Sequence, residues 1–236
     1  MNPNFGNSPK YMAEKLKVHL IADSIKEYGT EINHIHLNPD KEISEGLVYV
    51  QEGIAKIYGI NEKGLKINTD LILQGEIFLV QNGNYQSRDN FYLEGLKYSK
   101  IYFLPLSHLS SIQKEFLPEI QMKFYNERLK RIHQQKVRNY DLELQERVFY
   151  LLFDFCLIFG KASDAYYSMP NFFTHDELSN ILRNCRQNIT ACLNELKRDG
   201  IIQYNRKEIK IEKTIFEEKK VKYLSGLKKN KETVQC

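Results

Sequence analysis

The chain has 236 residues, of which 42% are hydrophobic and 27% charged, so it holds enough apolar sequence for the core of one large or two small domains. A net charge of +4 permits nucleic acid as a partner without requiring it, and four cysteines without a CxxC pair argue against a disulfide-stapled scaffold and for a reducing compartment. No secretory leader pattern and no apolar run long enough to span a bilayer is present, so we expect a cytoplasmic protein with no membrane partner.

The first expected element is a helix that ends near residue 28. Four apolar residues near one helical face predict its buried side: Met12, Leu16, Leu20 and Ile25. From residue 31 to about residue 105 the apolar period changes to two, which is typical of strands. The strand-like segments are residues 47–50, 54–58, 67–73 and 100–104, with Gly53 and Gly75 at turns between them. Short strands at this spacing indicate an antiparallel roll or barrel.

A long helix is predicted over residues 107–139. One apolar stripe of this helix consists of Leu117, Ile120 and Phe124. A second stripe has the three-four-three spacing of a coiled-coil seam and consists of Met122, Tyr125, Leu129 and Ile132. The helix either packs on its own roll alone or also pairs with a second copy. Because packing on the roll requires only one stripe, the pattern favours a homodimer.

The remaining sequence predicts several short elements. A helix over residues 143–159 ends at Gly160. Thr174 and Glu177 have the spacing of a capping box at the start of a short helix, and Gly200 provides a left-handed stop after a second helix. Two strands follow, over residues 201–204 and 208–211. Beyond Lys213 the lysine-rich tail is either a solvated helix with a frayed end or an arm that contacts phosphates.

Two short helices, a tight turn and a basic hairpin are the pattern of a winged helix-turn-helix. The second helix turns its apolar stripe inward and so presents polar residues at the end that would enter a major groove. Arg can pair with guanine, and Gln or Asn with adenine. The candidate DNA-contacting residues are Thr174, Cys185, Arg186, Gln187, Asn188, Thr190, Asn194, Arg206 and Lys207. The alternative is an ordinary helical hairpin with a solvated polar face.

The order of these elements resembles the Crp/Fnr family of bacterial transcription factors. The residues that carry the resemblance are Tyr49 to Gly53, Gln74 to Phe78, Arg147-Val148 with Leu151-Leu152, Thr174 with Glu177-Leu178, and Arg186 to Ile189. The similarity covers residues 32–211. It implies an α+β fold with an antiparallel β-roll like a cyclic-nucleotide-binding domain (residues 1–106), a dimerisation helix (107–139) and a winged helix-turn-helix domain (140–236).

The resemblance further implies a regulator that binds a palindromic operator in double-stranded DNA as a homodimer, with RNA polymerase as a further partner. Arg186 takes the position of the leading base-reading residue, and Gln187 replaces a residue that is usually Glu. Ala191 replaces an Arg that often contacts DNA, and Arg183-Asn184 replaces the usual turn glycine, where we expect Asn184 to be left-handed. No phosphate loop, nucleophile elbow or HExxH motif is present, so no enzyme is expected.

The predicted effector pocket of the roll departs from the cyclic-nucleotide pattern of the family. The residues at its positions are Leu79, Val80, Arg88, Asp89 and Asn90. Asp89 would repel a phosphate that an Arg would hold, although Arg88 is adjacent. Leu79 and Val80, with Phe91 and Tyr92, would line an apolar pocket that holds an apolar ligand or is filled by side chains. We therefore expect no response to cyclic nucleotides; the alternative is a cyclic-nucleotide or other small-ligand sensor that acts without DNA.

We expect no metal and no cofactor. An iron–sulfur cluster would need an N-terminal group of cysteines, which this chain lacks. His34 and His36 would share one face of a strand, but a metal site needs further ligands. Cys185 beside Arg186 would respond to oxidants if its pKa were lowered, although packing roles for Cys185 and Cys192 are favoured.

Overall fold

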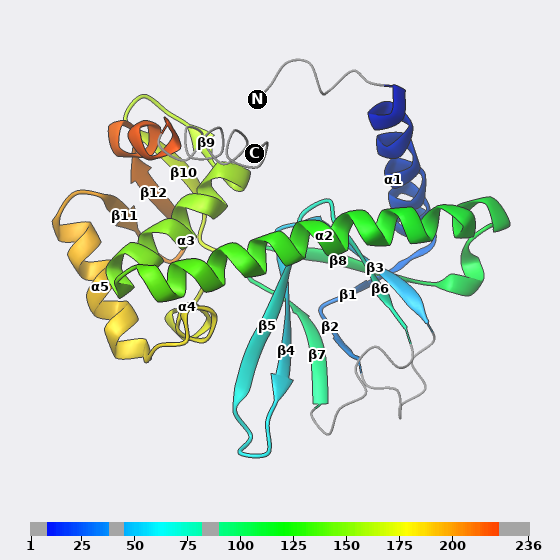
Figure 1. The fold of residues 1–236 in the computed structure, drawn as a ribbon, viewed down its shortest axis with the longest axis horizontal. Coiled ribbons are helices and arrows are strands. Elements are labelled where there is room, and N and C mark those ends of the chain that lie inside the picture. Colours follow the sequence, from blue (N-terminus) through cyan, green and yellow to red (C-terminus); the bar gives the residue numbers. More distant parts are fainter. Residues whose placement is uncertain (1–8, 38–44, 82–89, 222–236) are drawn as a thin grey trace, which may run out of the picture. The chain divides into compact units, whose positions relative to one another are not determined.

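The computed structural model describes residues 9–37, 45–81 and 90–221, and the side chains from residue 15 onward within those ranges. The chain divides into two compact units, one ending at Val137 and the other beginning at Arg138 (Figure 1). The domain limits expected from the sequence remain predictions. Within the described ranges no helix combines the length and apolar character that a membrane span requires. No group of three or more His, Cys, Asp or Glu side chains in those ranges is arranged to hold a metal.

Two four-stranded antiparallel sheets form the roll of the first unit, which confirms the antiparallel prediction. One sheet has the order β1 (Thr30–Ile32), β8 (Lys100–Pro105), β3 (Gly46–Glu52) and β6 (Ile77–Val80). The other has the order β2 (His34–His36), β7 (Asn90–Gly95), β4 (Ile54–Ile60) and β5 (Lys66–Leu73), and Figure 1 shows β5, β4 and β7 side by side. The strand signal in the sequence identified β3, β4, β5 and β8.

The period of two determines which side chains fill the roll. Along β6, Phe78 and Val80 point into the core between the two sheets, whereas Ile77 and Leu79 pack on the opposite side, against α1 (Pro9–Tyr28) and α2 (Ser111–Asp141). Leu79, predicted to line a pocket in the roll, therefore lies on the helical side of its sheet.

Each helix of the first unit buries one apolar stripe. For α2 the buried residues are Leu117, Ile120 and Phe124, as predicted. For α1 the predicted face was right at Ile25, which is buried, and wrong at Leu16 and Leu20, which are exposed. The helix buries Ile25 together with Ile21 and Ala22, with Val18 partly covered, a set that also has helical spacing.

The second unit begins with α3 (Leu144–Phe159), which ends at Gly160 as predicted. A Cβ atom at Gly160 would lie only 2.2 Å from the Cys156 carbonyl oxygen, so only glycine fits. Two helices follow, α4 (His175–Leu182) and α5 (Arg186–Arg198). The sheet of this unit has the order β11 (Ile202–Tyr204), β12 (Glu208–Glu212), β10 (Tyr166–Pro170) and β9 (Lys161–Ala162).

The chain after β12 is helical over residues 213–221, and the rest of the tail lies outside the described residues. Phe216 of this segment is only 1% exposed. Its ring centroid lies 4.8 Å from that of Phe153 on α3 and 4.0 Å from that of Tyr167 on β10. The interpretation of this segment as a solvated helix was therefore wrong for residues 213–221, since Phe216 anchors it in the core.

Candidate nucleic-acid interface

A capping box formed by Thr174 and Glu177 fixes the first turn of α4. The Thr174 hydroxyl accepts from the Glu177 backbone N–H at 3.2 Å, and the Glu177 carboxylate accepts from the Thr174 N–H at 2.7 Å, which confirms the capping box. Leu178, Ile181 and Leu182 are buried. Since its hydroxyl caps α4, Thr174 has a structural role in addition to its predicted contact with DNA.

The turn between α4 and α5 differs from the prediction at one residue. Arg183, not Asn184, adopts the left-handed conformation, with φ 51° and ψ 53°. The Asn184 side chain instead accepts from the Cys185 backbone N–H and from the Asn188 side-chain amide, both at 2.9 Å. Asn184 is therefore used for its hydrogen-bonding side chain rather than for its backbone freedom.

Helix α5 presents a polar face because its apolar face is buried. It buries Ile189, Cys192, Leu193 and Leu196. Gly200 has φ +73° after the last turn, which confirms the predicted left-handed stop. Arg186, Gln187 and Asn188 form the exposed first turn. Helix N-termini of this kind attract phosphate and bring side chains to base edges.

The structure places all nine predicted DNA-contacting residues at the N-cap of α4, on α5 with its N-cap, or in the turn of the β11–β12 hairpin. Eight are exposed and Thr190 is half-buried. The Arg186 guanidinium lies 3.5 Å from the Asp176 carboxylate, but both side chains are more than 60% exposed. An exposed pair of this kind is worth about 0–1 kcal/mol, so Arg186 can leave it for a ligand.

Two residues that sequence reasoning missed hold the outward face of α5. His175 on α4 makes a hydrogen bond through Nδ1 to the Thr190 hydroxyl at 2.8 Å. Tyr204 on β11 donates to the Asn194 side-chain oxygen at 3.0 Å. The His175 and Tyr204 rings lie 6.0 Å apart, and the Lys197 ammonium lies 5.7 Å from the Tyr204 ring. No sequence spacing relates these residues, because they meet only through tertiary packing.

The hairpin turn presents Arg206 and Lys207 to solvent. Its shape is fixed by Asn205, whose side-chain oxygen accepts from the backbone N–H groups of Lys207 at 2.7 Å and Glu208 at 3.0 Å. A hydrogen bond from Lys210 is the main reason that the pKa of Glu208 lies below its usual value. The turn therefore carries two exposed cations on a rigid frame.

The buried cysteines of this unit have packing roles. Burial raises the pKa of the Cys156 thiol to about 12 and also raises that of Cys192. Thiols with raised pKa values stay protonated at neutral pH and react slowly with oxidants. Cys185 is exposed at the N-cap of α5, where its side chain makes no capping hydrogen bond.

The predicted coiled-coil seam of the first unit lies beside the buried stripe of α2 and is partly exposed. Met122 is 60% exposed and Tyr125 55% exposed, while Leu129 and Ile132 are half-buried. These residues are distinct from the buried stripe that packs on the roll. An apolar surface of this kind along a helix is typical of a surface that a partner covers.

Two arginines of α2 hold strand β5 and the turn between β5 and β6. Arg131 donates to both oxygens of the Glu76 carboxylate at 2.6 and 3.0 Å and to the Leu71 carbonyl at 3.1 Å. Arg128 donates to Asp70 at 2.9 Å. Burial raises the pKa of Asp70, and the charge of Arg128 opposes that rise. These ion pairs fix α2 on the roll.

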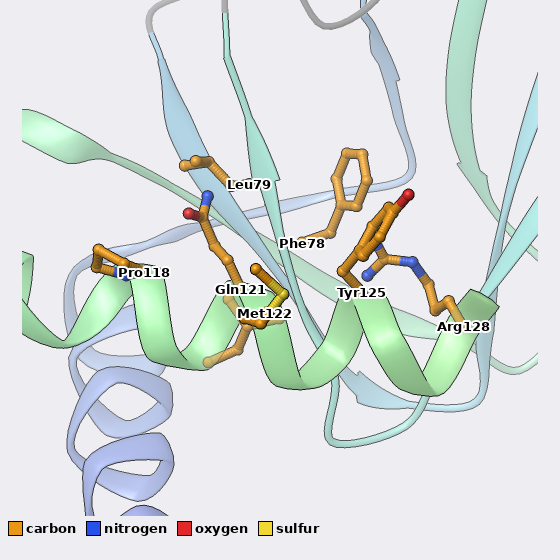
Figure 2. A pocket seen from close by; sticks show the side chains of 8 residues that line it. Phe78, Leu79, Pro118, Gln121, Met122, Tyr125 and Arg128 are labelled. Carbon is orange, nitrogen blue, oxygen red and sulfur yellow. The ribbon is translucent and has the colours of Figure 1, made fainter. Parts of the chain in front are cut away.

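An open pocket of about 530 Å³ lies between α2 and β6. Figure 2 shows Gln121 and Tyr125 extending from α2 towards Leu79 and Phe78 of β6. Met122 and Arg128 also line this pocket. It combines apolar walls with an amide, a phenol and a guanidinium, a composition that suits small organic ligands.

Of the predicted effector residues that the structure describes, Leu79 lines this pocket, whereas Val80 and Asn90 do not. Val80 points into the roll core. Asn90 starts β7 and makes a hydrogen bond to His36 at 3.3 Å. The prediction that Phe91 and Tyr92 both line a pocket in the roll was wrong for Tyr92. Phe91 packs against the roll core, whereas the Tyr92 ring stacks on Tyr58 and His34. The predicted residues Arg88 and Asp89 lie outside the described residues.

No protein-family model matches the sequence, and no curated protein matches it either. Solved structures do match. A CooA mutant from Carboxydothermus hydrogenoformans is 17% identical, with a TM-score of 0.61 over 84% of this chain and 89% of that chain. TTHA1359 from Thermus thermophilus, a transcriptional regulator of the CRP/FNR family, is 18% identical, with a TM-score of 0.56 over 78% of this chain and 90% of that chain. The chain has the fold of the Crp/Fnr regulators.

A third solved structure bears on the first unit. A cyclic nucleotide-binding domain containing protein from Listeria monocytogenes is 16% identical, with a TM-score of 0.57 over 84% of this chain and 98% of that chain. At these identities the likeness is one of fold. The resemblance seen in the sequence is confirmed at that level: antiparallel sheets like those of a cyclic-nucleotide-binding domain, followed by helices, form the Crp/Fnr fold.

Proposed function

We propose that the protein is a DNA-binding transcription regulator of the Crp/Fnr type and not an enzyme. The observation that carries this proposal is the first turn of α5, where Arg186, Gln187 and Asn188 are exposed at the N-terminus of the helix. In this proposal α4 and α5 are a helix-turn-helix, the β11–β12 hairpin is its wing, and Arg186 reads guanine. The Crp/Fnr fold supports it.

The proposed active form is a homodimer. The exposed apolar residues Met122 and Tyr125 on α2 support a helix pair between two copies, since Leu117, Ile120 and Phe124 already serve the roll. Two copies would present two α5 helices to the half-sites of a palindromic operator, one DNA turn apart. RNA polymerase is the further partner that such a regulator would engage.

The proposed effector is not a cyclic nucleotide. Val80 is an apolar residue at a position where nucleotide-binding members of the family would have a ribose-holding Glu, and it is buried in the roll core. Cyclic AMP is therefore expected to leave the melting temperature unchanged at a concentration that would saturate a micromolar site, whereas a ligand that binds the folded protein raises it. A clear rise would contradict this part of the proposal.

Selection from a random pool of double-stranded DNA by the purified full chain tests the proposal. A motif with two-fold symmetry, enriched without nucleotide, is the expected result. Arg186→Ala should abolish this enrichment while the protein keeps its dimeric mass. Enrichment only with nucleotide would contradict the effector proposal, and no enrichment under either condition would contradict the DNA-binding proposal.

A second candidate function is a small-ligand sensor that acts without DNA. The open pocket between α2 and β6, with Gln121, Tyr125 and Arg128 among its polar residues, favours this alternative. It predicts a ligand-dependent rise in melting temperature and no DNA selection.

A further inference from the structure

The residues on the outward face of α5 differ in how firmly other elements hold their side chains. Arg186 and Gln187 in the first turn are exposed, and the contact of Arg186 with Asp176 is exposed as well. Thr190 and Asn194, one and two turns further along, are each hydrogen-bonded to a side chain of another element. We propose that His175 and Tyr204 divide this face into a base-reading first turn and a C-terminal half that anchors the DNA backbone. This inference rests on the proposed DNA-binding function.

The Thr190 hydroxyl has no proton left to donate to DNA. It donates its single proton to the Arg186 carbonyl at 2.9 Å, so it must accept from His175 Nδ1 at 2.8 Å. His175 therefore carries a proton on Nδ1. Phosphate oxygens and the purine N7 atom accept hydrogen bonds but do not donate them, so Thr190 contributes to neither kind of contact.

The Asn194 side chain is held as a donor. Its oxygen accepts the Tyr204 hydroxyl proton at 3.0 Å, which leaves the two N–H groups of its amide directed away from that bond. Asn194 is exposed, and the Lys197 ammonium near the Tyr204 ring adds positive charge next to it. A fixed pair of donors beside a cation is suited to phosphate oxygens.

The position of Asn194 along α5 also favours the backbone over the bases. It follows Arg186 by eight residues, which is about 12 Å along a helix at 1.5 Å per residue. The major groove is about 12 Å wide, so a helix whose first turn lies at the bases brings Asn194 to the bordering phosphate strand. Tyr204 and His175 are thus positioning residues, and Asn194 is the residue of this C-terminal half that touches DNA.

The experiment compares variants of the full chain by DNA selection and by affinity as a function of salt concentration. Asn194→Ala should lower affinity roughly three- to tenfold, the loss of about one hydrogen bond, and equally for all sequences. Asn194→Asp keeps the acceptor for Tyr204 but replaces the N–H donors with a charged oxygen, so it should lower affinity further. Tyr204→Phe keeps the ring and should give part of the Asn194→Ala loss.

The base preferences should stay unchanged in these variants and in Thr190→Val. The salt dependence of the affinity distinguishes the neutral contact of Asn194 from the charged contact of Lys197. Asn194→Ala should leave the slope of log K against log salt unchanged, whereas Lys197→Gln should reduce it by about 0.9. Tyr166→Phe is the matched control, because it removes a different tyrosine hydroxyl, one that accepts from the Gln203 amide at 2.8 Å.

Two results would overturn the inference. A changed base preference in Asn194→Ala or Thr190→Val would mean that these residues read bases. An Asn194→Ala affinity equal to that of Tyr166→Phe and of the unaltered chain would mean that Asn194 does not touch DNA. Failure of the unaltered chain to select any DNA would instead contradict the proposed function itself.

Discussion

Arg131→Ala should destabilise the first unit more than loss of a surface ion pair would. The Glu76 carboxylate is only 7% exposed and accepts two hydrogen bonds from Arg131 and one from the Leu73 backbone N–H. Removing one partner of a fully buried pair costs about 3–5 kcal/mol, because the other charge stays buried. The Arg131 side chain is 32% exposed, so water can replace part of the interaction. We expect a loss of about 2–3 kcal/mol.

Calorimetry of the full chain would measure this loss. At roughly 3–4 °C per kcal/mol for a unit of this size, the transition of the first unit should fall by about 6–12 °C. A transition of the second unit is an internal reference, since Arg131 and Glu76 both belong to the first. Glu119→Gln, which weakens the half-exposed pair with Lys17, is the matched control and should cost less than about 1 kcal/mol.

A double-mutant cycle would test the cause of the loss. Replacing Glu76 by Leu together with Arg131 by Met removes both charges and leaves apolar groups, so it should cost less than the two single changes added together. Arg131→Ala that costs no more than Glu119→Gln would refute the reasoning. Additivity within about 0.5 kcal/mol would refute it as well, because it would show that the two charges do not interact.

Tyr125→Arg places a charge in the proposed dimer seam and should halve the mass in sedimentation, whereas an unchanged mass would contradict the role of the seam. Phe216→Ala removes a buried ring and should destabilise the second unit by about 3–5 kcal/mol in urea unfolding; a loss below about 1 kcal/mol would show that the helix at residues 213–221 is not anchored there. Arg183→Gly should gain about 0.5–1 kcal/mol, because glycine adopts the left-handed conformation without strain, while Arg183→Ala should gain nothing. Burial raises the pKa of Asp154, although Arg138 donates to it, so the folded state favours the protonated acid. The stability of the unaltered chain relative to Asp154→Asn should therefore rise as the pH falls from 7 towards 4, and a decrease would contradict this sign.

Sequence patterns located the features that depend on local interactions. The capping box of Thr174 and Glu177 involves residues three apart, and Gly200 ends α5 through its own backbone, so neither needs a distant partner. The buried stripe of α2 was also visible, because helical spacing alone brings Leu117, Ile120 and Phe124 to one face.

Where the sequence allowed two structures equally well, tertiary packing determined which one forms. In helix α1, Ile25 has helical spacing with Leu16 and Leu20 and also with Ile21 and Ala22, and the roll buries it with the second pair. In the turn before α5, Arg183 or Asn184 could have been left-handed. The Asn184 side chain is required for hydrogen bonds to Cys185 and Asn188, which leaves the strained backbone to Arg183.

The sequence by itself determined the order of elements and the polar first turn of α5, because periodicity, caps and turn residues act over a few positions. Only the tertiary structure decided which side chains restrain that face. His175 and Thr190 are 15 residues apart, and Tyr204 and Asn194 lie on different elements. The same holds for Arg131 and Glu76, 55 residues apart. Such pairs form only when packed elements bring them together, so no spacing along the chain records them.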